Sequence, residues 1–314
     1  MDDLPIDFKE LVFAKTEGIP YYIEEIIKSL QINVTDKNDL SSMARGDHIV
    51  KIPTTIQDVI MSRVDRLPEM SKEILQYGAV IEREFSYDLL KQVMSLSEQE
   101  LLTNMEILKD SELLYERGIF PESIYIFKHA LTREVIYDSI LAPKKKGLHE
   151  KIGNAVEVLY KENIAEYYGV LVEHFVQSEN YQKGAEYSKM AGRAALKKTA
   201  FKDAISYTKK RVYCLERLPQ TDEVLKKLID TRTSLSIYYT SLNFSIEAME
   251  TINPIVDIAL KMDYQKSLPR IFAVTGAYHF YVEEDLPNAI KELKKTIEVS
   301  EKIGDFLSLW FGSY

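Results

Sequence analysis

The chain has 314 residues, a formal net charge of −9 at pH 7 and a single cysteine. Its 12 glycines and 10 prolines are few for this length, so tight turns are scarce and long helices are favoured over many short strands. No pair of glycines has the spacing of a phosphate-binding loop, a dinucleotide fingerprint or a nucleophile elbow, which excludes the enzyme classes that those motifs define.

The sequence carries no signature of a metal site or of membrane insertion. Its five histidines lack metal-ligand spacing, and Cys214 alone makes neither a thiolate cluster nor an internal disulfide. No run approaches the roughly 18 apolar residues of a membrane helix, and the acidic start of the chain is unlike a signal peptide. We therefore expect a cytoplasmic protein with no membrane partner, no metal and no catalytic residues of its own.

Residues 1–51 contain one clear helical segment, Tyr21–Leu30, which follows Gly18 and Pro20. Proline is favourable at the first position of a helix, because its missing N–H would have no helical partner there. The polar stretch over residues 31–51 predicts a loop or a hairpin.

Residues 52–142 predict short helices and then a hairpin. Thr55 and Ser97 each stand three positions before an acidic residue, which is the pattern of a capping box at a helix start. The apolar period then changes to strand-like segments on either side of Gly118 and Pro121. Short helices followed by a hairpin are the pattern of a winged helix. The helices are expected over residues 56–67, 69–80, 87–93 and from 98 onward.

From residue 143 the chain reads as helical throughout and contains an internal recurrence. At Tyr181, Phe201, Phe244 and Leu286, an aromatic residue or leucine is followed three or four positions later by alanine. A period of about 40 residues is typical of stacked helix pairs. We expect the alanines to let neighbouring helices approach closely and the larger residues to fill the gaps between pairs. Pro254 predicts a kink or a break in its helix.

Three stretches resemble one known family. Lys15–Ile26 resembles the end of the ATPase module in large bacterial and archaeal signalling ATPases, where the usual form is K-T-E-G-N-P-F-F-I-E-E-I. Ile52–Pro68 is similar to the segment that follows in those proteins, and Phe127–Ile140 resembles a third signature. The three stretches occur in the family's order. The proteins are the STAND-type ATPases, often fused to nucleotide cyclases, protein kinases or DNA-binding regulators.

The resemblance implies a mainly α chain in three parts. Residues 1–51 would be the C-terminal remnant of an ATPase module, and residues 52–142 a winged-helix domain with a small β-hairpin. Residues 143–314 would be an α-α superhelix of tetratricopeptide-like repeats. Since the chain ends inside what reads as a further helix, we expect the repeats to be truncated at the C-terminus.

The resemblance also implies residues that contact nucleotide. In the family the proline of a Gly-x-Pro element packs against adenine, so Gly18 and Pro20 would do so in an intact parent, although Ile19 replaces the usual Asn. His129 would correspond to a winged-helix histidine that contacts phosphate in some related ATPases; a capping or packing role is the alternative. Because the chain lacks the phosphate-binding loop and the metal-binding acid, ATP or ADP with Mg would belong to the parent, and we expect no cofactor here.

A winged helix also raises the question of DNA binding. Its recognition helix would be Glu98–Asp110, which carries four acidic residues against Lys109 alone. Phosphate contact needs lysine and arginine, and residues 52–142 have a net charge of −7. We therefore expect no nucleic-acid partner through this chain and interpret the domain as a joint between the ATPase module and the repeats.

Four tyrosines in the repeats, Tyr238, Tyr239, Tyr278 and Tyr281, are candidates for a partner groove, with repeat core as the alternative. The leading hypothesis is a regulatory sensor fragment. It would bind a protein, peptide or small-molecule ligand in the repeats and relay this to an upstream nucleotide-binding domain. The alternatives are a stand-alone tetratricopeptide-repeat adaptor, or part of a transcription regulator whose DNA-binding domain lies outside this chain.

Overall fold

The computed structural model describes residues 20, 22–24 and 55–305, and these divide into two units between Leu148 and His149. The described residues between 20 and 24 are helical. Gly18, the rest of the predicted helix Tyr21–Leu30 and the irregular stretch 31–51 lie outside the described residues. The boundaries at 51/52 and 142/143 stay predictions.

The first unit contains a run of short helices, as the sequence predicts. Thr55 caps α4, because its Oγ1 accepts from the backbone N–H of Asp58 at 3.1 Å. At α7, Ser97 and Glu100 form a complete capping box, in which each side chain bonds the other residue's backbone N–H. The helices are α4 (Ile56–Asp65), α5 (Glu69–Ile81), α6 (Tyr87–Val93), α7 (Glu98–Asp110) and α8 (Ala130–Ser139).

A three-stranded antiparallel sheet completes the first unit, with the strand order β1-β3-β2. The strands are β1 (Glu84–Ser86), β2 (Leu114–Arg117) and β3 (Ile124–Phe127). The predicted hairpin is confirmed, since β2 pairs with β3 and Gly118 takes a φ of +97° in the connection. Strand β1 was not predicted, because a segment of three residues is too short to show the alternation of a strand.

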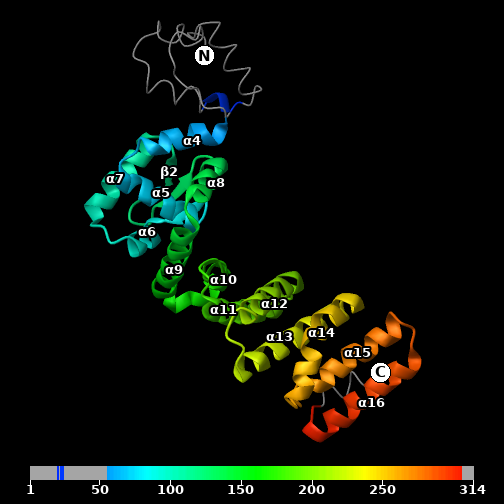
Figure 1. The fold of residues 1–314 in the computed structure, drawn as a ribbon. Coiled ribbons are helices and arrows are strands. Elements are labelled where there is room, and N and C mark those ends of the chain that lie inside the picture. Colours follow the sequence, from blue (N-terminus) through cyan, green and yellow to red (C-terminus); the bar gives the residue numbers. More distant parts are fainter. Residues whose placement is uncertain (1–19, 21, 25–54, 306–314) are drawn as a thin grey trace, which may run out of the picture. The chain divides into compact units, whose positions relative to one another are not determined.

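In the second unit, the described residues form helices joined by short connections, which confirms the mainly α prediction (Figure 1). The elements after α8 are α9 (Ala142–Leu159), the 3₁₀-helix η1 (Lys161–Tyr167), α10 (Tyr168–Gln177), α11 (Tyr181–Lys197), α12 (Phe201–Leu215), α13 (Asp222–Ser241), α14 (Ser245–Lys261), α15 (Leu268–Tyr281) and α16 (Leu286–Ile303). The most extensive contacts join α11 with α12, α13 with α14 and α15 with α16. The unit is therefore a helical repeat, and its helix α14 continues through Pro254 without a break.

The small residues of the recurrence occupy equivalent places in the repeat. Ala204, Ala248 and Ala289 are each the fourth residue of the second helix of a pair, and each is 1% exposed. The expectation about the larger residues holds for Tyr181, which is partly buried against the core of the second unit, but it was wrong for Phe201 and Leu286, which are both 53% exposed. Both stand at the first position of a helix, where about half of the side chain stays exposed.

Candidate functional site

The three family-like stretches meet in the first unit. Glu24, from the first stretch, forms an ion pair with Lys128 of the third stretch at 3.7 Å. Tyr22 is 7% exposed, and its pKa is raised by burial and then by the charge of Asp58, which belongs to the second stretch. Segments that lie more than 100 residues apart in the sequence therefore contact one another here.

The predicted nucleotide residues lie at this junction only in part. Gly18 is outside the described residues, and Pro20 is exposed on helical backbone. His129 is half-buried and immediately precedes α8, with extended backbone as the N-cap residue. The described residues include Pro20 and His129 but not Gly18, and a nucleotide role for these residues stays a prediction.

The helix considered for DNA recognition is α7, and its one cationic residue, Lys109, is already paired with acidic side chains. Lys109 donates to Glu106 at 2.6 Å and to Glu116 of β2 at 2.8 Å. These two hydrogen bonds raise the pKa of Lys109 above its ordinary value. The hydrogen bond from Lys109 lowers the pKa of Glu116. Ser123 also donates to Glu116, at 2.6 Å. Lys109 thus ties α7 to the hairpin.

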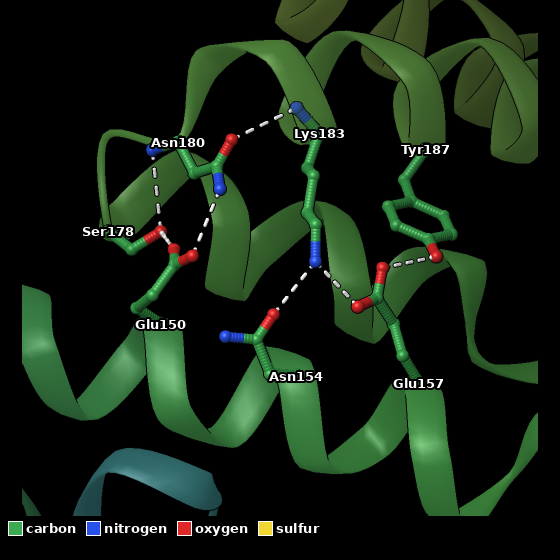
Figure 2. Close-up of polar contacts among 7 residues, drawn as sticks. All are labelled: Glu150, Asn154, Glu157, Ser178, Asn180, Lys183 and Tyr187. Atoms are coloured by element: carbon green, nitrogen blue, oxygen red, sulfur yellow. Dashed lines mark hydrogen bonds and ion pairs between the residues drawn. The ribbon is translucent and has the colours of Figure 1, made fainter.

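A polar network in the second unit joins α9 to the start of α11 (Figure 2). The Glu150 carboxylate accepts from Ser178 Oγ at 2.9 Å and from Asn180 Nδ2 at 3.0 Å. Asn180 in turn caps α11. This half of the network anchors the turn before α11 on α9.

The other half of the network contains a lysine, a tyrosine and a glutamate, which are residue types that perform acid–base chemistry. Lys183 Nζ donates to Glu157 at 2.6 Å and to Asn154 at 2.8 Å, and the Tyr187 hydroxyl donates to the second oxygen of Glu157 at 2.6 Å (Figure 2). Burial and then the bond to Glu157 raise the pKa of Tyr187 above its ordinary value. Each donor already has an acceptor within the protein, so the network is structural and serves helix packing.

An apolar pocket of about 500 Å³ opens between α13, α15 and α16. Its walls include Ala277, Phe280 and Tyr281 of α15 and Ile290 of α16, and Tyr281 is 71% exposed. This size falls within the usual range of ligand pockets. The pocket therefore has room for an apolar group of a ligand or a partner side chain.

A second, polar pocket of about 270 Å³ is bordered by α11, α12, α13 and the start of α15. We call it the basic pocket, because its charged lining residues are Lys189, Arg193, Arg211, Lys266 and Arg270 against Asp230 alone. Arg270 lines both pockets, so the two are neighbours.

The four candidate tyrosines do not gather in a single pocket. Tyr281 lines the apolar pocket and Tyr238 the basic pocket. Tyr239 instead packs its ring edge-on against Phe244, with ring centroids 6.4 Å apart, and Tyr278 packs against His279 at 6.3 Å. Neither Tyr239 nor Tyr278 is among the side chains that line these two pockets.

The sequence reading missed the residues of the basic pocket. Arg193 and Arg211 are 18 residues apart, on two helices that are joined by a short turn, and Asp230 lies on the next helix. Charged residues are common on helix surfaces, so only the helix packing distinguishes these from solvated ones.

Two absences hold for the part of the chain that the structure describes. No group of three or more histidine, cysteine, aspartate or glutamate residues there is placed to hold a metal ion. No helix there is both long enough and apolar enough to cross a membrane.

The comparisons with known proteins give distant matches. No family model matches the chain. An uncharacterized protein of Rhizobium meliloti (strain 1021) is 24% identical over 217 residues, which is 67% of this chain and 20% of that protein. A solved structure from Pyrococcus horikoshii, of a signal transduction ATPase with numerous domains that has a tetratricopeptide repeat sensor, aligns with 94% of this chain at 15% identity, with a TM-score of 0.32. The chain spans 49% of that structure and a fifth of the length of the Rhizobium protein.

Proposed function

We propose that this chain is the regulatory part of a signalling ATPase of the STAND type. In this proposal the first unit contains a winged-helix joint and the end of a nucleotide module, and the second unit is a tetratricopeptide-like sensor. The carrying observation is that Lys15–Ile26, Ile52–Pro68 and Phe127–Ile140 resemble three family signatures, and that their described residues contact one another in the first unit.

The sensor acts by binding, and the chain performs no catalysis itself. A protein, peptide or small-molecule ligand occupies the apolar and basic pockets, which Arg270 connects. Occupancy biases the arrangement of the first unit, and this bias is passed to a nucleotide-binding domain outside the chain. ATP or ADP with Mg belongs to that domain.

Coupling between the two units is the property that separates a sensor from a stand-alone adaptor. Ala277 lines the apolar pocket, and Ala277→Leu would fill part of it as a bound apolar group does. We expect the amides of α8 in the first unit to change their hydrogen-exchange rates by about 5-fold or more, as coupling free energies of about 1–3 kcal/mol imply. Hydrogen-exchange mass spectrometry of the whole chain measures this.

The matched control is Ala165→Leu, which adds the same methyl groups at an exposed position of the second unit. It should leave the exchange of α8 unchanged. If Ala277→Leu changes hydrogen exchange only in the second unit, from His149 onward, the two units are uncoupled. The chain would then be an adaptor and not a sensor.

A further inference from the structure

The basic pocket holds positive charge that the protein does not neutralise. Asp230 accepts from Lys266 Nζ at 2.6 Å and from Ser267 Oγ at 2.9 Å, so its carboxylate is already engaged. Arg270 forms a long ion pair of 3.9 Å with Asp305. The remaining cations are Lys189, Arg193 and Arg211, and none of them forms an ion pair within the described part of the chain.

These three cations also repel one another. The pKa of Lys189 is lowered by partial burial and then by the charges of Arg211 and Arg193. The pKa of Arg211 is lowered by burial; Asp230 raises it in part, and Arg193 lowers it further. Lys189 and Arg193 are exposed and Arg211 is half-buried, so an anion that enters the pocket would reduce the repulsion among the three cations.

Two residues that line the basic pocket have buried hydroxyl groups without a hydrogen-bond partner among the described residues. Ser188 of α11 is 1% exposed and Thr233 of α13 is 2% exposed. The hydroxyl oxygen of each has no hydrogen-bond partner among the described residues. Buried polar groups are nearly always hydrogen-bonded, so each of these two hydroxyl groups would gain stability from a partner that the described residues do not supply.

We propose that the basic pocket binds a small phosphomonoester. Such a group carries about −1.5 to −2 charges at pH 7 and has three acceptor oxygens, which matches two guanidinium groups and one ammonium group. Arginine binds planar pairs of phosphate oxygens in a bidentate manner. The volume of about 270 Å³ suits a phosphorylated compound of few carbons better than a dinucleotide. The inference names the ligand class of the sensor and rests on the proposed function for its biological role.

The test is isothermal titration calorimetry of the whole chain with glycerol 3-phosphate, with glycerol as the uncharged analogue. Glycerol 3-phosphate should bind and glycerol should not, and binding should weaken as NaCl is raised. AMP distinguishes the sources of the phosphate: tighter binding of AMP indicates a nucleotide, and tighter binding of glycerol 3-phosphate indicates a small metabolite. Either result supports the phosphomonoester class.

The variant Arg193→Gln removes an exposed pocket cation, so the chain should keep its fold. We expect it to weaken glycerol 3-phosphate binding about tenfold or more, as loss of a charge-assisted hydrogen bond implies. Arg211→Gln, on α12, should act in the same way. The matched control is Lys197→Gln, one turn further along α11, exposed and outside the pocket.

Three results would overturn the proposal. The first is the absence of binding heat up to about 10 mM glycerol 3-phosphate, because a dissociation constant above that is weaker than that of most specific sites. The second is that Arg193→Gln and Lys197→Gln weaken binding equally. The third is that the dicarboxylate succinate binds as tightly as glycerol 3-phosphate. Because exchange in α8 is not read in this experiment, its failure leaves the test of coupling between the two units unaffected.

Discussion

At the scale of single residues, a buried pair of histidines in the second unit has a consequence for stability. His149 Nδ1 and His174 Nδ1 lie 2.9 Å apart, and the two residues are 6% and 3% exposed. One ring must donate through Nδ1 while the other accepts, so the accepting ring has to be neutral. Burial, and then the charge of His149, lower the pKa of His174 to about 3.

This pair predicts a loss of stability in mild acid. Above the unfolded pKa of about 6.5, His174 is neutral in both states and its contribution is complete. Between about 6.5 and 3 the unfolded chain binds a proton that the folded chain does not, so the unfolding free energy falls by up to about 1.4 kcal/mol per pH unit. Urea denaturation at several pH values from 7.5 to 5 measures the slope.

Two variants test whether His174 causes this dependence of the unfolding free energy on pH. His174→Phe removes the titrating ring and should flatten the dependence on pH, whatever its effect on absolute stability. His279→Gln, which removes a histidine that pairs with Glu283 at 2.5 Å on the surface of α15, should keep it. An unchanged slope in His174→Phe would show that another group is responsible.

At the scale of elements, glycine positions decide how closely paired helices approach. A Cβ at Gly184 of α11 would lie 2.9 Å from Cys214 Sγ of α12, and Cys214 is fully buried. A Cβ at Gly276 of α15 would lie 3.2 Å from Leu293 of α16. Together with Ala204, Ala248 and Ala289, these residues keep each pair in close contact.

Two glycine substitutions should therefore have opposite effects on stability. Gly184→Ala places a methyl group against a buried sulfur and should lower the unfolding free energy by about 1–3 kcal/mol. Gly147→Ala in α9 meets nothing within 4 Å and should raise it by about 0.5–1 kcal/mol through helix propensity. Urea denaturation followed by circular dichroism compares the two, and equal stability of Gly184→Ala and the unsubstituted chain would contradict this account.

The turns between helices show the limit of turn prediction. Thr199, Asn243 and Glu284 each precede the N-cap residue of the next helix and take φ values of 57°, 63° and 54°. Glycine is the usual residue for this backbone region, and its scarcity in the chain made tight turns seem rare. Helix packing therefore holds these residues in a conformation that they adopt only infrequently.

At the scale of the whole molecule, charge differs along the chain. Residues 52–142 have a net charge of −7, whereas residues 143–314 have a net charge of +2. The basic pocket is lined by five cations and one acid among the described residues, but it is too small to follow a nucleic-acid backbone.

The chain should accordingly fail to bind duplex DNA. We expect no saturable change in fluorescence anisotropy with a labelled duplex of about 20 base pairs, even at about 50 mM salt, where non-specific binding is strongest. A dissociation constant below about 1 μM would contradict this expectation and show that the chain itself binds nucleic acid.

Signals carried by neighbouring residues were enough to predict the helical character, the capping residues of α4 and α7, the hairpin at Gly118 and the repeat of small residues. Each of these depends on contacts within a few positions, or on a spacing that recurs along the chain. The resemblance to STAND-type ATPases also comes from contiguous motifs.

The pockets, the histidine pair and the contact between Glu24 and Lys128 could not be predicted in this way. His149 and His174 are 25 residues apart, and Arg193, Arg211 and Asp230 lie on three different helices. Which helix faces become neighbours depends on packing summed over many buried side chains, and no local pattern encodes that sum. For this reason the four predicted tyrosines do not share one pocket. The cations of the basic pocket are neighbours only in the packed structure, and the sequence alone did not group them.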